Sequence, residues 1–220
     1  TLHPLQSLTD VITITEQLAL RPLSGRKPRV VLTWAPHIKP LPQCVANSFA
    51  QWITAWGKAD LVIAHPDLLP AAQRLAALHR HQGDAIVALG GGSPIDAAKA
   101  IAVLANNPEP LSLYQGYHKV TRAGVPVVAI PTTAGTGSEV SAAAVLTDKA
   151  NHVKVSTLSN FLRPRLAIVD PELTVSCPPK VTADSGIDAL THAIEAYTAV
   201  DNEVFPLPPG ERSTYQGRTP

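Results

Sequence analysis

The stretch of sequence that determines the fold is DAIVALGGGSPIDAAK, residues 84–99 of a 220-residue chain. Its apolar run at residues 84–89 predicts a buried strand, and the segment after the three glycines predicts a helix over residues 94–105. A strand that passes directly through glycines into a helix is typical of parallel sheets covered by helices. This stretch therefore predicts an α/β fold.

The rest of the chain repeats the same alternation of strand and helix. Strands are predicted for residues 29–33, 61–64, 84–89, 125–130 and 166–169, and helices for residues 2–18, 44–56, 69–81, 94–105 and 182–199. Most of the strands are continuous apolar runs, which indicates a sheet that is buried on both faces. We predict a doubly wound, mostly parallel sheet, whose ligands bind at the carboxyl ends of the strands.

Composition excludes several classes of protein. Hydrophobic residues make up 45% of the chain and charged residues 16%, which is typical of a globular protein. A formal net charge of +1 argues against a general nucleic-acid or membrane-surface binder. No apolar run reaches the roughly 20 residues of a membrane span, and the first residues lack a signal-peptide pattern. With Cys44 and Cys177 expected as free thiols, we predict a cytoplasmic protein.

Residues 90–93, the glycine turn, form the first candidate site. Glycines let the backbone approach an anion closely, and the start of the next helix offers unpaired N–H groups. Ser93 suits an N-cap, Pro94 the first helical position and Asp96 the reciprocal capping partner. The same residues also suit a tight, well-capped turn with no ligand. The glycines do not have the Rossmann spacing, and there is no Walker lysine.

Residues 132–139, the threonine loop, follow the strand predicted for residues 125–130. Hydroxyl groups and bare backbone at a strand end suit contacts to phosphate, ribose or an amide. The hydroxyl residues of the loop are Thr132, Thr133, Thr136 and Ser138. An ordinary polar loop explains them equally well when the loop is taken alone, but a second glycine-rich loop in the same sheet favours binding.

Asp188 and His192 form a third candidate site, on the helix predicted for residues 182–199. A spacing of four residues places both side chains on one helical face, where they could hold a divalent metal such as Fe²⁺ or Zn²⁺. Two ligands do not complete a metal site, and an Asp–His pair on a helix surface is the simpler interpretation.

Residues 67–200 resemble the iron-containing (group III) alcohol dehydrogenase family. The resemblance is carried by residues 84–99, by PTTAGTGSE at residues 131–139 and by GIDALTHAIEAY at residues 186–197, in the order and spacing of the family. It implies hydride transfer between a primary or secondary alcohol and NAD or NADP, with the aldehyde or ketone as the other small-molecule partner. It implies a bound Fe²⁺ or Zn²⁺ that polarises the alcohol oxygen.

The resemblance also implies roles for single residues. The pyrophosphate would lie on Gly91, Gly92 and Ser93, with Asp96 beside them. The cofactor cleft would be lined by Thr132, Thr133, Thr136 and Ser138, Lys154 would lie near the nicotinamide ribose, and Asp188 and His192 would be two of four metal ligands. The two further histidine ligands of the family belong to a helical domain that we do not find here. Trp34 stands where the family has an Asp that contacts the adenosine ribose, so the choice between NAD and NADP stays open.

Residues 1–66 show a second resemblance, to N-acetyl- and N-succinylornithine carbamoyltransferases. It is carried by HPLQSLTD at residues 3–10 and LTWAPHIKPLPQCVANSFAQW at residues 32–52. His3 and Gln6 would match the motif for carbamoyl phosphate, and His37 a residue near the amino-acid substrate. The arginine-rich phosphate loop of that family is absent, so no carbamoyl transfer is expected.

Together the two resemblances suggest a chimera. The expected regions are an α/β segment at 1–66, a dinucleotide-binding region at 67–175, the first helix of a truncated all-α metal-binding domain at 176–200 and an irregular tail at 201–220. The favoured function is alcohol dehydrogenase, impaired by truncation unless a homo-oligomer supplies missing ligands. The alternatives are a carbamoyltransferase-like transferase and a non-catalytic nucleotide-binding remnant.

Overall fold

The structure, a computed structural model, describes residues 25–34, 44–64, 71–148 and 151–198, together with six helical residues near the N-terminus. These six are Val11, Ile12, Ile14, Thr15, Glu16 and Leu18. Other predictions fall outside the described residues: the rest of the helix at 2–18, the boundary at 66/67 and the tail at 201–220. The four proposed regions therefore stay a prediction.

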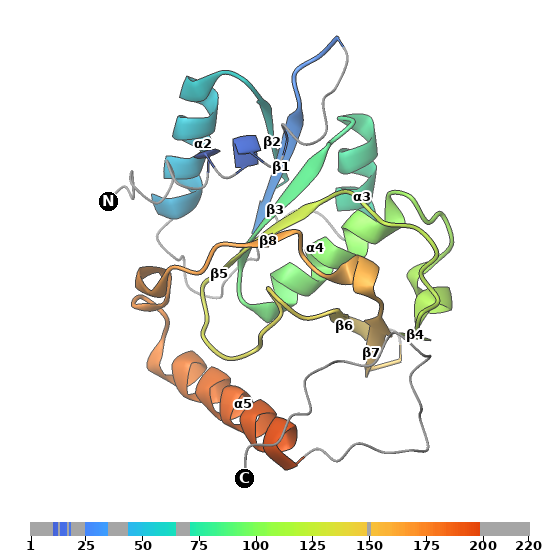
Figure 1. Ribbon diagram of the computed structural model, residues 1–220, viewed down its shortest axis with the longest axis vertical. Coiled ribbons are helices and arrows are strands. Elements are labelled where there is room, and N and C mark those ends of the chain that lie inside the picture. Colours follow the sequence, from blue (N-terminus) through green and yellow to red (C-terminus); the bar gives the residue numbers. More distant parts are fainter. Residues whose placement is uncertain are drawn as a thin grey trace.

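A five-stranded parallel sheet forms the centre of the molecule (Figure 1). Its strands are β1 (Arg29–Trp34), β2 (Asp60–Ala64), β3 (Ala85–Gly90), β5 (Val127–Pro131) and β8 (Leu166–Ala167), in the order β2-β1-β3-β5-β8. All four pairings between neighbours are parallel. The prediction of a doubly wound, mostly parallel α/β sheet is confirmed.

Helices cover both faces of this sheet. Successive strand residues point to opposite faces, so Val30 and Leu32 pack in one apolar cluster and Val31 in the other. The first cluster includes residues of α2 (Cys44–Trp56) and of the N-terminal helical residues, and the second includes residues of α3 (Ala71–Arg80) and α4 (Gly92–Leu104). The sheet therefore lies between two helical layers and is buried on both sides.

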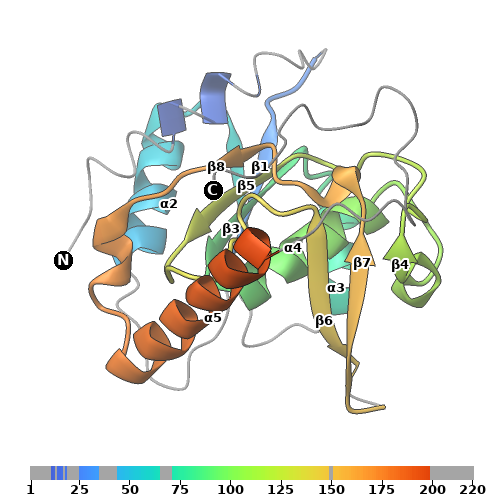
Figure 2. The ribbon, with the colours of Figure 1, turned by 60° about the horizontal axis from the view of Figure 1, so that its bottom comes forward.

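The second, smaller sheet was not predicted from the sequence. It joins β4 (Gly116–Tyr117) to a hairpin of β6 (Ala143–Asp148) and β7 (Val153–Leu158). Figure 2 shows this hairpin beside α4. Its signal was the alternation of β-branched residues, Val153, Val155 and Thr157, after a polar turn. Three short 3-10 helices lie in the connections: η2 (Leu111–Tyr114) between α4 and β4, η3 (Asn160–Leu162) between β7 and β8, and η4 (Pro171–Thr174) after β8.

The last described helix, α5 (Pro179–Thr198), lies against the molecule without a buried residue in the part of the chain that the structure describes. Its large apolar side chains are 54–76% exposed: Ile187, Leu190, Ile194 and Tyr197. Figure 1 shows the helix below the carboxyl end of β3, next to the loop that follows β5. Among the described helices, none is both long and apolar enough to cross a membrane.

Candidate functional site

The glycine turn and the threonine loop leave the sheet side by side. Gly90 ends β3 in register with Pro131 at the end of β5, and the N–H of Thr132 donates to the carbonyl oxygen of Gly90 at 3.0 Å. Gly90 has a φ of 141°, a conformation that residues with a side chain rarely adopt. The two loops that the sequence singled out therefore meet at the carboxyl edge of the sheet.

Two threonines pack against bare backbone in this turn. A Cβ at Gly91 would lie 3.1 Å from Oγ1 of Thr133, and one at Gly92 would lie 2.9 Å from Oγ1 and 3.0 Å from Cβ of Thr136. These distances leave no ordinary room for a side chain at Gly92. The loops thus interlock: close contact with Thr136 favours glycine at Gly92, and the backbone conformation favours it at Gly90.

The predicted capping of α4 is wrong in detail. The helix begins at Gly92, its N-cap is Gly91, and no described side chain caps it. Ser93 is therefore an exposed residue of the first turn, and Asp96 is turned away from it toward other partners. Since Gly91 cannot cap through a side chain, the first N–H groups of α4 are left without a capping side chain. An anion bound at the turn would satisfy them.

Asp96 and Lys99 form a buried network beneath the two loops. Oδ1 of Asp96 accepts hydrogen bonds from Oγ of Ser138 and from Nζ of Lys99, the latter at 3.2 Å. Its Oδ2 accepts from the backbone N–H of Val145 in β6 at 2.9 Å. One carboxylate of α4 therefore holds both the threonine loop and the hairpin.

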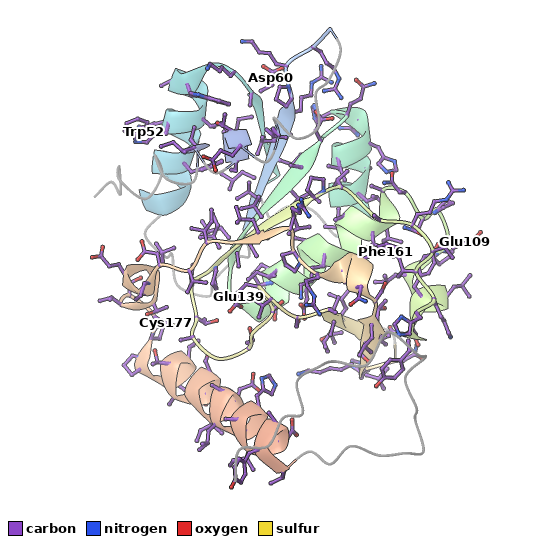
Figure 3. All side chains as sticks on the ribbon, in the orientation of Figure 1. Trp52, Asp60, Glu109, Glu139, Phe161 and Cys177 are labelled. Atoms are coloured by element: carbon purple, nitrogen blue, oxygen red, sulfur yellow. The ribbon has the colours of Figure 1, made fainter. Side chains whose placement is uncertain are left out.

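The ammonium group of Lys99 is fully enclosed, with 0% of the residue exposed. Besides Asp96 it donates to Oγ of Ser141 at 3.1 Å and to the carbonyl oxygen of Ala143 at 2.8 Å, so its three protons have three acceptors. Burial lowers the pKa of Lys99, and the negative charges of Asp96 and Glu139 oppose that shift. Figure 3 shows Glu139 near the start of α4.

Lys154 lies on the hairpin, apart from the glycine turn. It pairs with Thr147 across the two strands, and its side chain is exposed. Because side chains alternate along a strand, it shares a face with Val145 two residues before Thr147. The strand that pairs with Lys154 is therefore the one that Asp96 anchors at Val145.

Asp188 and His192 lie on one face of α5, as the spacing predicts. Their Oδ1 and Nε2 atoms are 3.9 Å apart, and their side chains are 47% and 53% exposed. Ligand atoms of one tetrahedral zinc ion lie about 2.0–2.2 Å from it, which places two of them about 3.3–3.6 Å apart. A small side-chain rotation would bring this oxygen and nitrogen to that separation. Within the described ranges, no cluster of three or more His, Cys, Asp or Glu residues could hold a metal ion.

Comparison with known proteins identifies the family of the chain. The model of the family described as "Iron-containing alcohol dehydrogenase" matches residues 21–171. The chain belongs to this family.

Individual relatives agree with that assignment. The chain is 53% identical to the NAD-dependent methanol dehydrogenase of Bacillus methanolicus over 116 residues. These residues make up 53% of this chain and 30% of that protein. Among solved structures, a 1,3-propanediol oxidoreductase aligns with a TM-score of 0.73 and 32% identity, over 88% of this chain and 50% of that one. The sulfoacetaldehyde reductase of Bifidobacterium kashiwanohense, solved with NAD⁺, aligns with a TM-score of 0.66 and 30% identity, over 87% and 49%. The chain thus spans about half of each of these two solved structures and about a third of the B. methanolicus relative.

The resemblance to carbamoyltransferases has no support. The match to the dehydrogenase family begins at residue 21 and so includes most of residues 1–66. β1 and β2 pair in parallel with each other, and β1 pairs with β3, so residues 29–34 and 60–64 belong to the same sheet as the glycine turn. The family match covers both of these strands. His3, Gln6 and His37 lie outside the described residues.

Sequence reasoning missed two features of this candidate site. The buried position of Lys99 was not predicted, although a lone cation in the apolar helix segment AAKAIAVL signals a buried ion pair. The sequence also shows no sign that Gly135 lies against the backbone of α5 at Ser185. That contact joins segments 50 residues apart, and no local pattern announces it.

Proposed function

We propose that this protein is a nicotinamide-dependent alcohol dehydrogenase. Backbone N–H groups at Gly91, Gly92 and Ser93 would hold the pyrophosphate of NAD(P) at the start of α4. The observation that carries the proposal is the close packing of Thr133 and Thr136 against Gly91 and Gly92. The turn lies at the carboxyl edge of the sheet, and no described side chain caps the helix that follows it. Parallel α/β sheets bind dinucleotides at this edge.

The remaining candidate residues would surround the rest of the cofactor. Hydroxyl groups of Thr132, Thr133, Thr136 and Ser138 are proposed to line the cleft, and Lys154 to meet the nicotinamide ribose from the hairpin. Asp96 would act through Ser138 and Val145, which it holds in place. The B. methanolicus relative is named as NAD-dependent, which supports NAD as the cofactor. NADPH must be tested as well, because Trp34 stands where the family has an acidic residue. An acidic residue there would repel the 2′-phosphate of NADPH.

Asp188 and His192 would hold a divalent metal. A carboxylate oxygen and an imidazole nitrogen suit both Fe²⁺ and Zn²⁺, and the family is named for iron. When bound, such an ion supplies Lewis-acid stabilisation of an alcohol oxygen, beside a nicotinamide that accepts hydride. Primary and secondary alcohols are the proposed substrate class.

The direct test is titration of the protein with NADH and with NADPH, followed by nicotinamide fluorescence. We expect saturable binding, and Gly92→Val should abolish it, because a side chain there collides with Thr136. Gly186→Ala is the matched control, since a Cβ at Gly186 meets nothing within 4 Å. A wild-type protein that binds neither cofactor at millimolar concentration contradicts the proposal.

A second measurement separates an enzyme from a nucleotide-binding module. Ethanol oxidation is followed with NAD and added Fe²⁺ or Zn²⁺, in the wild type and in the Asp188→Ala/His192→Ala variant. An enzyme loses its activity in the variant but keeps its NADH affinity. NADH binding without oxidation in the wild type favours the non-catalytic alternative.

A further inference from the structure

Gly135, in the middle of the threonine loop, lies directly against the backbone of α5. A Cβ at this position would overlap the carbonyl oxygen of Ser185 and come within 2.6 Å of its carbonyl carbon. Both atoms belong to the backbone of a helix, so no change of rotamer can relieve the collision. The requirement for glycine here is therefore the close approach of α5.

Two nearby residues of the threonine loop contact the glycine turn. Thr133 packs on Gly91 and Thr136 packs on Gly92, both at the start of α4. The threonine loop therefore lies between the glycine turn on one side and α5 on the other, and Figures 1 and 2 both show it next to α5.

Ser185, Asp188 and His192 are spaced at i, i+3 and i+7, so they share one face of α5. The face that touches the loop at Ser185 is thus the face that carries the two proposed metal ligands. Since α5 has no buried residue in the described chain, few other contacts there fix its distance from the sheet.

We infer that Gly135 is a positioning residue, which sets how closely the Asp188–His192 pair approaches the dinucleotide site. The inference rests on the proposed function, because it requires both a cofactor and a metal. Carbon atoms in contact lie about 3.5–4.0 Å apart, so a methyl group at Gly135 must push α5 and the loop apart by about 1 Å. A displacement of that size between reacting groups lowers a rate on the order of 100-fold.

The test compares the wild type, Gly135→Ala and Gly186→Ala, which adds a methyl group in open space one residue after Ser185. We expect the Kd for NADH to stay within about threefold in all three, because the contacts at Gly91 and Gly92 are kept. In Gly135→Ala alone, kcat for ethanol oxidation should fall 10- to 100-fold. The KM for NAD should stay within about threefold.

A readout without turnover is the quenching of bound NADH fluorescence by Co²⁺, which depends on the distance between metal and nicotinamide. We expect quenching in the wild type, loss of it in His192→Ala, and weaker quenching in Gly135→Ala than in Gly186→Ala. Equal kcat and equal quenching in the two glycine variants would overturn the inference.

If Gly135→Ala does not fold, the quenching of NADH fluorescence in the wild type still tests the inference. A wild-type protein that binds both NADH and Co²⁺ without quenching has the two sites far apart, and this also overturns the inference. A wild type that binds neither NADH nor Co²⁺ instead contradicts the proposed function. The two failures are therefore distinct.

Discussion

Lys99 places an ammonium group in the interior, directly beneath the loops that are proposed to hold the cofactor. The desolvation of this charge is offset by Asp96 and by two neutral oxygens, from Ser141 and Ala143. Replacing both charges of such a pair by apolar groups is often tolerated, whereas removing one charge leaves the other buried without its partner. The network is therefore sensitive to single changes.

We predict that Lys99→Met lowers the free energy of unfolding by about 3 kcal/mol, because Asp96 keeps a buried charge without its cation. Urea denaturation followed by circular dichroism measures this loss. Asp96→Asn in the Lys99→Met background should recover part of the stability, since it removes the unpaired charge. Equal stability of wild type and Lys99→Met would show that the ion pair contributes nothing net.

At the scale of elements, the sequence predicted the parts of the site that follow from local chemistry. The β3–α4 unit follows from an apolar run, three glycines and an apolar helix, and its observed bounds differ from the prediction by one or two residues. The strand predicted for residues 166–169 is shorter, Leu166–Ala167. The Ser93 cap failed because helix α4 begins two residues earlier than predicted, at Gly92, where tertiary contacts with Thr136 favour bare backbone.

The rest could not be predicted because it depends on contacts between distant segments. The partners of Asp96, for example, come from residues 138 and 145, across 42 and 49 positions of sequence. The hairpin itself had a local signal, its alternation of β-branched residues. Its attachment to α4 became visible only in the fold.

The hairpin carries a prediction of its own at Lys154. We expect Lys154→Ala to weaken NADH binding by about tenfold, equivalent to about 1.4 kcal/mol, if this exposed cation meets the ribose side of the cofactor. Stability should change by less than about 0.5 kcal/mol, because the side chain is on the surface. The fluorescence titration measures the first effect and urea denaturation the second. Lys119→Ala, another exposed lysine, is the control, and equal affinities of the two variants would remove Lys154 from the site.

Across the whole molecule, β3 connects two ends with different roles. At its carboxyl end lies the glycine turn, and just before its first residue lies Asp84. Asp84 accepts two hydrogen bonds from the Arg26 guanidinium, at 2.7 and 2.8 Å, and one from the backbone N–H of Arg29 at 2.8 Å. This cluster ties the start of β1 to the start of β3, at the edge of the sheet opposite the proposed cofactor site.

The charge of Asp84 should make stability depend on pH without affecting cofactor binding. Burial raises the pKa of Asp84, but the hydrogen bonds from Arg26 and Arg29 outweigh it and hold the pKa below its ordinary value. A carboxylate with a lowered pKa stabilises the fold above the unfolded-state pKa of about 3.9, and this contribution is lost as the pH falls through the folded-state value.

Asp84→Asn should therefore lower the free energy of unfolding by about 1 kcal/mol between pH 5 and 7, a modest value because the Arg26 partner is solvent-exposed. The difference from the wild type should shrink below about pH 4, where the wild type also loses its charge. Urea denaturation over this pH range measures it, with the NADH Kd at pH 7 as the second readout. Since Asp84 and the glycine turn lie at opposite ends of the same strand, we expect that Kd to be unchanged. A variant that lost both stability and NADH affinity in proportion would show that the two ends of β3 are coupled.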